Sequence, residues 1–185
     1  MNAAKEVFAE AGYHGASINA IIERAQIARG TFYLYFESKS AVFDSILEQA
    51  LSDLRSRIHR IAVDDSGAPP PQVQLRAQVL ATLEYVIRDR SLALLLLSAG
   101  HTPDAEATER LDQFFADMRD LLQRALQTGM ELGLLRPCQP ELVAAAMLGM
   151  IRGVIELLVR QSSVRPIDEV VTEMLTVALR GVLVA

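Results

Sequence analysis

Apolar side chains recur every three to four residues through most of the chain, and this spacing limits the fold more than any other feature. One run crosses residue 45 without a break. It consists of Val42, Phe43, Ile46, Leu47, Ala50, Leu54, Ile58 and Ile61. Such residues share one face of an α-helix, whereas a half-buried strand alternates every second residue. The absence of that alternation predicts an all-α fold, with one long helix across residue 45.

Aromatic residues divide the chain near this helix. Seven of the ten lie before residue 45, and the remainder of the chain is rich in Leu, Ala, Val and Met. We therefore predict an N-terminal domain at residues 1–45 and a larger domain at residues 46–185. Because the helical pattern crosses the boundary, the joining segment is expected to be a shared helix rather than a flexible linker.

Three short helices are expected before residue 35. The first, residues 2–11, stops at Gly12, and the second, residues 18–25, has Ser17 as a hydroxyl N-cap. The third covers residues 28–34, and Ser38 caps the fourth helix. The second and third helices, joined by a turn at residues 25–27, have the lengths of a helix-turn-helix, whose second helix enters the major groove of DNA.

The aromatic cluster at the end of the third helix suits that role. Phe32 and Phe36 are expected to point inward and fix the helix. Tyr33 and Tyr35 combine a flat ring with a hydroxyl and are expected at the surface, against a sugar–phosphate wall. The small residues Gly30 and Thr31 would let the helix approach bases closely. The alternative is that both tyrosines are ordinary core residues.

Residues 3–43 resemble the DNA-binding domain of the TetR family of transcriptional regulators. The resemblance rests on Ala4, Phe8, Gly12, Tyr13, Ser17, Ile18, Ile21, Ala25, Arg29, Gly30, Thr31, Tyr33, Tyr35, Phe36, Lys39 and Phe43. It implies groove-facing positions at Arg29, Gly30, Thr31, Tyr33 and Leu34. It also implies phosphate contacts from Ser17, Tyr35 and Lys39.

The chain departs from the family pattern at three places. Gln26 replaces the usual turn glycine, and Ala28 replaces the usual hydroxyl cap of the third helix. The chain also begins partway into the family's first helix, without the basic residues that generally precede it, so we expect residues upstream of Met1. These departures would weaken the DNA-binding domain without abolishing its activity.

The C-terminal region resembles the family only in architecture, with helices that enclose a ligand and a final pair that forms a dimer. Helices are predicted at residues 74–89 and 91–99, within 101–135, from Pro140 and after Pro166. The predicted dimer interface consists of Ala145, Gly149, Gly153, Leu157, Val171, Met174, Leu175 and Ala178. The alternative is that both final helices are buried within one monomer. The predicted lining of the ligand pocket, for an apolar or amphipathic molecule, is Tyr85, Leu92, Leu96, Phe114, Phe115, Met118, Met147 and Ile151.

Composition limits the other possibilities. The mean hydropathy of +0.22 is high for one soluble monomer and favours oligomerisation. Uninterrupted apolar runs are too short for a membrane span, and no apolar signal core precedes residue 13, so a cytoplasmic protein is expected. Cys138 is the only cysteine and has no nearby His, so we expect no internal disulfide, no metal site and no cofactor.

Charge gives no basic DNA-binding footprint. The net charge is −5 overall, and residues 1–45 hold four basic against five acidic side chains. The prediction of DNA binding therefore rests on the motif and implies only modest non-specific affinity.

These features predict a ligand-responsive transcriptional regulator. We expect a homodimeric repressor that sets two recognition helices about 34–36 Å apart on a palindromic DNA operator. One alternative is a ligand-binding helical dimer whose helix-turn-helix no longer binds DNA. An enzyme is disfavoured, because Cys138 and the dispersed histidines offer no nucleophile–base pair.

Overall fold

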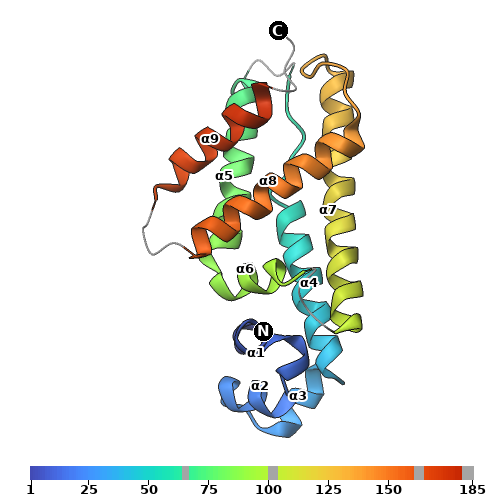
Figure 1. The fold of residues 1–185 in the computed structure, drawn as a ribbon, viewed down its shortest axis with the longest axis vertical. Helices are drawn as coiled ribbons and strands as arrows, with labels where there is room; N and C mark the ends of the chain where they lie inside the picture. Colours follow the sequence, from blue (N-terminus) through green and yellow to red (C-terminus); the bar gives the residue numbers. More distant parts are fainter. Residues whose placement is uncertain (64–66, 100–103, 161–164, 181–185) are drawn as a thin grey trace. The chain divides into compact units, whose positions relative to one another are not determined.

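A computed structural model of the chain describes residues 1–63, 67–99, 104–160 and 165–180 (Figure 1). These residues form helices and no strand, which confirms the predicted all-α fold class. The helices are α1 (Asn2–Gly15), α2 (Ile18–Ala25), α3 (Arg29–Tyr35), α4 (Lys39–Arg55), α5 (Pro71–Arg88), α6 (Arg90–Leu97), α7 (Ala105–Glu131), α8 (Pro140–Arg160) and α9 (Ile167–Arg180).

The chain divides into two compact units. Unit 1 comprises Met1–Asp53 and Asp89–Phe115, and unit 2 comprises Leu54–Arg88 and Ala116–Ala185. Unit 1 is therefore larger than the predicted N-terminal domain of residues 1–45, because α6 packs on α1. The domain boundary near residue 45 stays a prediction, whereas the expected shared helix is present as α4, which contains the division between Asp53 and Leu54.

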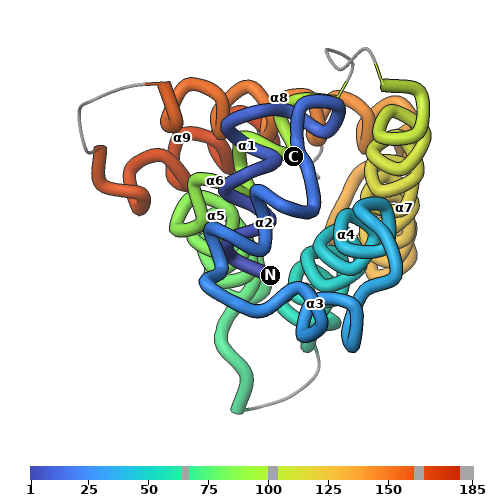
Figure 2. Tube along the Cα trace, turned by 90° about the horizontal axis from the view of Figure 1, so that it is seen from below, coloured from blue at the N-terminus to red at the C-terminus, as the bar shows by residue number. Residues whose placement is uncertain are grey.

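The first three helices occur near their predicted positions, although α1 continues past Gly12 to Gly15 and α3 is shifted by one residue (Figure 2). Gly12 interrupts α1 with a φ of 68°, and the Ser17 hydroxyl accepts a hydrogen bond from the Ala20 amide at 3.1 Å. Gln26 adopts the left-handed conformation at φ 54°, which costs an L-residue roughly 1–2 kcal/mol. Ala28 precedes α3 without a side-chain cap. The anticipated departures at Gln26 and Ala28 thus occur in the turn between α2 and α3.

An aromatic cluster holds the first helices together. The ring of Phe43 on α4 meets the rings of Phe8 and Tyr13 on α1, with centroid separations of 5.2 and 4.9 Å and edge-on geometry. All three side chains are buried. Edge-to-face packing adds to the free energy gained by burying such rings. The N-terminal concentration of aromatic residues therefore serves largely as the core of unit 1.

The fourth helix is shorter than its apolar pattern predicts. It ends at Arg55, although Ile58 and Ile61 continue the helical spacing. The side chain of Gln78 on α5 bonds the backbone of His59, and the side chain of Gln74 bonds the backbone of Ala62. These amides satisfy backbone groups that a continuing helix would have used internally, so the chain leaves the helix at low cost.

Unit 2 is organised around α5, which contacts both α8 and α9. In Figure 1, α9 lies along one side of α5. The long α7 ends near Gly133, whose φ is 70°. Pro140 is the first residue of α8, as predicted. Helix α5 begins at Pro71, three residues before the predicted start at residue 74.

Helix α8 is long and apolar enough to cross a membrane by length and composition alone. The helix is longer than the uninterrupted apolar runs considered in the sequence, and it carries the charged residues Arg152 and Glu156. The 21-residue helix has a mean hydropathy of 2.1 in its most apolar window, of which 17% is buried. A large apolar surface of α8 is therefore uncovered within the described residues.

Candidate nucleic-acid interface

The recognition helix α3 separates an inward anchor from an outward surface. Phe32 is 2% exposed, and its ring lies 5.9 Å from that of Phe36. In contrast, Tyr33 is 45% exposed, Leu34 82% and Tyr35 77%. The alternative of two core tyrosines therefore does not describe this structure. Two phenols and one aliphatic side chain are presented together to solvent.

The start of α3 is open to an approaching molecule. Arg29 is exposed, and its guanidinium lies 5.8 Å from the centroid of the Tyr33 ring. A Cβ added to Gly30 would meet nothing within 4 Å. Gly30 is therefore not required by internal packing or by a left-handed φ. Thr31, next in sequence, is half-buried.

Ser17 has capacity left for a further contact. Its oxygen caps α2 by accepting from Ala20, and the side chain is exposed. A hydroxyl also carries a proton that it can donate. The structure therefore leaves Ser17 able to cap its helix and to donate to a phosphate oxygen at the same time.

Lys39 lies in a different environment. Its Nζ donates to the backbone oxygen of Tyr13 at 2.7 Å and to that of Ala16 at 3.1 Å. The same ammonium lies 4.4 Å from the centroid of the Tyr13 ring. Lys39 thus joins the start of α4 to the end of α1, in addition to any role at DNA.

Two other basic residues of the N-terminal segment form ion pairs. Lys5 on α1 pairs with Asp89, whose other carboxylate oxygen caps α6 through the Leu92 amide. Arg24 on α2 bonds Glu6 at 3.0 Å and Glu10 at 2.7 Å, both on α1. The hydrogen bond from Arg24 lowers the pKa of the Glu10 carboxyl. Both pairs connect helices within unit 1.

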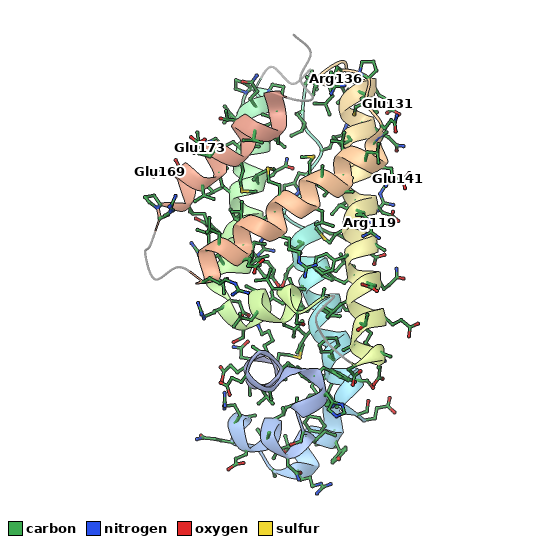
Figure 3. The ribbon with its side chains drawn as sticks, in the orientation of Figure 1. Arg119, Glu131, Arg136, Glu141, Glu169 and Glu173 are labelled. Carbon is green, nitrogen blue, oxygen red and sulfur yellow. The ribbon has the colours of Figure 1, made fainter. Side chains whose placement is uncertain are left out.

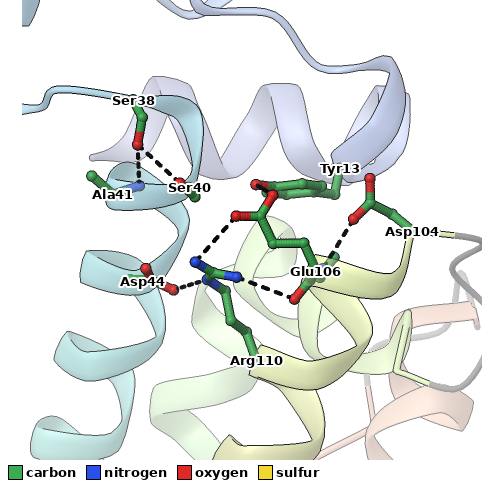
Figure 4. A network of polar contacts seen from close by, with 9 residues as sticks. Tyr13, Ser38, Ser40, Ala41, Asp44, Asp104, Glu106 and Arg110 are labelled. Carbon is green, nitrogen blue, oxygen red and sulfur yellow. Dashed lines mark hydrogen bonds and ion pairs between the residues drawn. The ribbon is translucent and has the colours of Figure 1, made fainter.

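A polar network joins α1, α4 and α7 inside unit 1 (Figure 4). The Tyr13 hydroxyl donates to Glu106 at 2.8 Å, and Glu106 pairs with Arg110 at 3.2 Å. Arg110 in turn pairs with Asp44 on α4. Burial, followed by the bond to Glu106, raises the pKa of Tyr13 well above its usual value. The network holds the first turns of α7 against the helices that carry α3.

The start of α7 carries a second polar contact to α1. Asp104 caps α7 by accepting from the Ala107 amide at 3.1 Å, and that bond is the main reason for its lowered pKa. His14 lies 3.6 Å from the other oxygen of Asp104. Sequence reasoning missed all these partners. Only the Glu106–Arg110 pair, four residues apart on a helix, was readable beforehand.

Changing Tyr13 to Phe is expected to remove one transition from the alkaline titration of the protein, above the ordinary tyrosine pKa of about 10. Folding raises the pKa of Tyr13, so its neutral hydroxyl stabilises the folded state. This stabilisation is fully present below about pH 10 and is lost as the pH rises through the folded-state pKa. Ultraviolet titration of phenolate, parent against variant, measures the difference. Superimposable curves would contradict the placement of Tyr13 beside Glu106.

The predicted pocket residues fall in both units. Leu92, Leu96, Phe114 and Phe115 belong to unit 1, and Tyr85, Met118, Met147 and Ile151 belong to unit 2. Four of them are buried, namely Leu92, Leu96, Phe114 and Met118. The other four are half-buried. In unit 2 the guanidinium of Arg57 lies 4.2 Å from the centroid of the Tyr85 ring. The common pocket stays a prediction.

The predicted dimer residues divide between surface and core. On α8 an exposed stripe consists of Ala145, Gly149, Gly153 and Leu157. On α9, Val171 and Met174 are instead buried in unit 2, where α9 packs on α5, which corrects their assignment to a surface. Leu175 and Ala178 are half-buried. The outer side of α9 carries Glu169 and Glu173, one turn apart (Figure 3).

Comparisons with known proteins agree with this geometry. Residues 1–46 match the family profile "Bacterial regulatory proteins, tetR family", and residues 68–182 match "Tetracyclin repressor-like, C-terminal domain". The HTH-type transcriptional repressor DhaR of Mycobacterium sp. (strain GP1) is 30% identical over 172 residues, covering 90% of this chain and 84% of DhaR.

Solved structures share the fold. The transcriptional regulator FadR from Bacillus subtilis, in complex with stearoyl-CoA, superimposes with a TM-score of 0.78 at 20% identity, over 97% of this chain and 96% of FadR. SmeT, the repressor of the Stenotrophomonas maltophilia multidrug efflux pump SmeDEF, superimposes with a TM-score of 0.75 at 23% identity. The match covers 99% of this chain and 88% of SmeT. The similarity thus extends over nearly the whole chain.

Proposed function

Because this chain belongs to the TetR family of transcriptional regulators, we propose that it represses transcription by binding a palindromic DNA operator as a homodimer. It is a ligand-responsive, DNA-binding regulator of the kind that its relatives represent. The observation that carries the operator-binding role is the exposed surface of α3, where Tyr33 and Tyr35 face solvent while Phe32 anchors the helix. That surface disfavours the alternative of a helix-turn-helix without DNA affinity.

Roles on the DNA follow from what each side chain offers. Arg29 can donate to guanine in the major groove, and the aliphatic Leu34 can contact a thymine methyl group. Gly30, Thr31 and Tyr33 share that groove-facing surface in our proposal. Ser17 and Tyr35 donate hydroxyl protons to phosphates, which fix the register without reading sequence.

Replacing Gly30 with Ala is expected to change stability and DNA binding in opposite directions. The added methyl group meets nothing within the chain, so the free energy of unfolding should rise by roughly 0.5–1 kcal/mol through helix propensity. The same methyl occupies the surface that approaches the bases, so operator affinity should fall on the order of tenfold. Urea unfolding and fluorescence anisotropy measure the two effects. A more stable variant with undiminished affinity would argue against close approach at Gly30.

The homodimer proposal rests on α8. Its exposed stripe of Ala145, Gly149, Gly153 and Leu157 presents small and apolar groups, which let a second helix approach closely. Leu175, Ala178 and the 68%-exposed Val177 of α9 are the residues that could extend this surface. Two copies of α8 and α9 would then form a four-helix interface.

The proposed effector is a small apolar or amphipathic molecule. Support comes from the apolar character of the candidate lining residues, and from FadR, which was solved with the amphipathic stearoyl-CoA. Effector binding would change the separation of the two recognition helices, so that one half-site is lost. We place the protein in the cytoplasm, where such regulators meet DNA, and propose no catalytic step.

Gel-shift assays with DNA flanking the gene test the proposal. The expected result is a retarded band that requires an inverted repeat and that competitor duplex without the repeat does not remove. Absence of any repeat-dependent band across low and moderate salt would instead support a ligand-binding dimer without DNA affinity.

A further inference from the structure

The basic residues of the DNA-binding segment are unusually few and mostly engaged within the chain. Residues 1–46, all of which the structure describes, contain Lys5, Arg24, Arg29 and Lys39. Lys5 pairs with Asp89, and Arg24 bonds two glutamates of α1. Arg29 is exposed and contacts only a ring face in the described structure.

Lys39 is held by two backbone oxygens and an aromatic ring. An ammonium group has three donors, and two of those of Lys39 go to the oxygens of Tyr13 and Ala16. These carbonyls lie at the end of α1, where backbone oxygens lack partners inside the helix. Cations are also favoured at a helix C-terminus by the helix dipole. The Tyr13 ring beneath the ammonium adds a cation–π contact.

Reaching outward would break these interactions. If Lys39 turned to a phosphate, two backbone oxygens and the Tyr13 ring would lose their partner together. The charge of Lys39 also helps to stabilise the nearby Asp104 carboxylate, which caps α7. The side chain therefore contributes to the packing of α1, α4 and the start of α7, all in unit 1.

We propose that Lys39 is a positioning residue, which fixes α1 to α4 and thereby orients α3, and that Arg29 is the one cation of residues 1–46 that meets the operator. The remaining phosphate contacts come from neutral hydroxyl donors. This inference rests on the proposed DNA-binding function, and it changes the phosphate-binding role that family resemblance implies for Lys39.

Salt dependence distinguishes the two roles. The slope of log affinity against log salt concentration becomes shallower by about 0.9 for each phosphate that the protein no longer neutralises. Although Arg29 is proposed to donate to guanine, its charge also displaces counterions at the DNA surface, so removing it from both subunits of a dimer should flatten the slope by about 2. Removing a positioning residue should leave the slope unchanged, because no cation leaves the DNA surface.

The first experiment compares Lys39→Met, Arg29→Met and the parent on a duplex selected by the parent protein from a randomised library. Lys39→Met should bind on the order of tenfold more weakly at every KCl concentration, with the parent's slope. Its affinity for an unrelated duplex should stay at the parent's value, since non-specific binding depends on the charges at the surface. Arg29→Met should flatten the slope. The other lysine supplies the matched control, because Lys5→Met should change neither quantity.

Circular dichroism at the assay temperature shows whether each variant is folded. Weaker specific binding by folded Lys39→Met supports positioning, because a purely structural role would lower affinity only in proportion to the unfolded fraction. A slope flattened as much as in Arg29→Met, or an equal loss on unrelated DNA, would overturn the proposal.

A second measurement needs no variant. Lys5 and Lys39 are the chain's only lysines, so acetylation by an amine-reactive ester, read by mass spectrometry, reports each one separately. Lys39 should react much more slowly than the lysine of a short unfolded peptide of the same local sequence, equally with and without the duplex. Ready acetylation that only DNA suppresses would show a phosphate contact and overturn the inference. If no duplex is selected at all, the proposed function itself fails.

Discussion

Replacing Phe43 with Ala is expected to destabilise unit 1 by about 3–5 kcal/mol, the usual cost of deleting a buried phenyl ring. Phe43 is 2% exposed and lies edge-on to both Phe8 and Tyr13, so its removal leaves a cavity lined by α1. A loss of this size is a large part of the stability of an ordinary domain. Operator binding should therefore be lost at temperatures where the parent remains folded. Guanidinium unfolding followed by circular dichroism, with anisotropy on the operator, measures both effects.

Tyr35→Ala is the matched control for Phe43→Ala. Its ring is 77% exposed, so the free energy of unfolding should change by less than about 0.5 kcal/mol. Operator affinity should nevertheless fall, because a hydroxyl that faces phosphate has been removed. Comparison of the two variants distinguishes an aromatic residue that stabilises unit 1 from one that contacts DNA. Equal losses of stability in both variants would contradict this division.

Replacing Gly153 with Arg is expected to convert the protein from dimer to monomer and to lower operator affinity by about 10²–10⁴-fold. The second half-site is bound at high effective concentration only while the two subunits stay joined. A Cβ added to Gly153 meets nothing within 4 Å in its own chain, so the protomer can accept the new side chain. Its effect must then come from the partner helix, against which a charge would be buried. Sedimentation velocity and anisotropy measure the two outcomes.

Gln127→Arg provides the same change of charge at an exposed position of α7, also in unit 2. This variant should remain dimeric with the parent's affinity. A Gly153→Arg protein that stays dimeric would move the interface away from the exposed stripe of α8. Monomeric behaviour in both variants would show that charge alone, rather than the position on α8, prevents association.

Sequence reasoning was most accurate where local chemistry decides the structure. The Ser17 cap and the inward Phe32 follow from a hydroxyl and from helical spacing, and the structure confirms both. The predicted continuation of α4 past Arg55 was wrong. The side chains of Gln74 and Gln78 bond the backbone that follows the helix, so the helix ends earlier. Those partners lie on another helix and are invisible to a pattern of apolar residues.

The contact partners of individual side chains were the hardest features to predict. Val171 and Lys39 each have the residue type expected for its proposed role, and both face a partner in their own chain. For Val171, the packing of α9 on α5 decides which side of an apolar helix is covered. For Lys39, the decisive partners are backbone oxygens, which every residue possesses and which no sequence motif marks. Such assignments require the tertiary structure.

The exposed stripe on α8 also bears on the cellular concentration of the protein that repression would need. If subunits are mostly separate at low copy number, the concentration of the paired form rises with the square of chain concentration. A twofold change in expression would then change promoter occupancy by more than twofold, until pairing saturates. If α8 joins the subunits as proposed, its stripe of small and apolar residues would make the regulator sensitive to gene dosage.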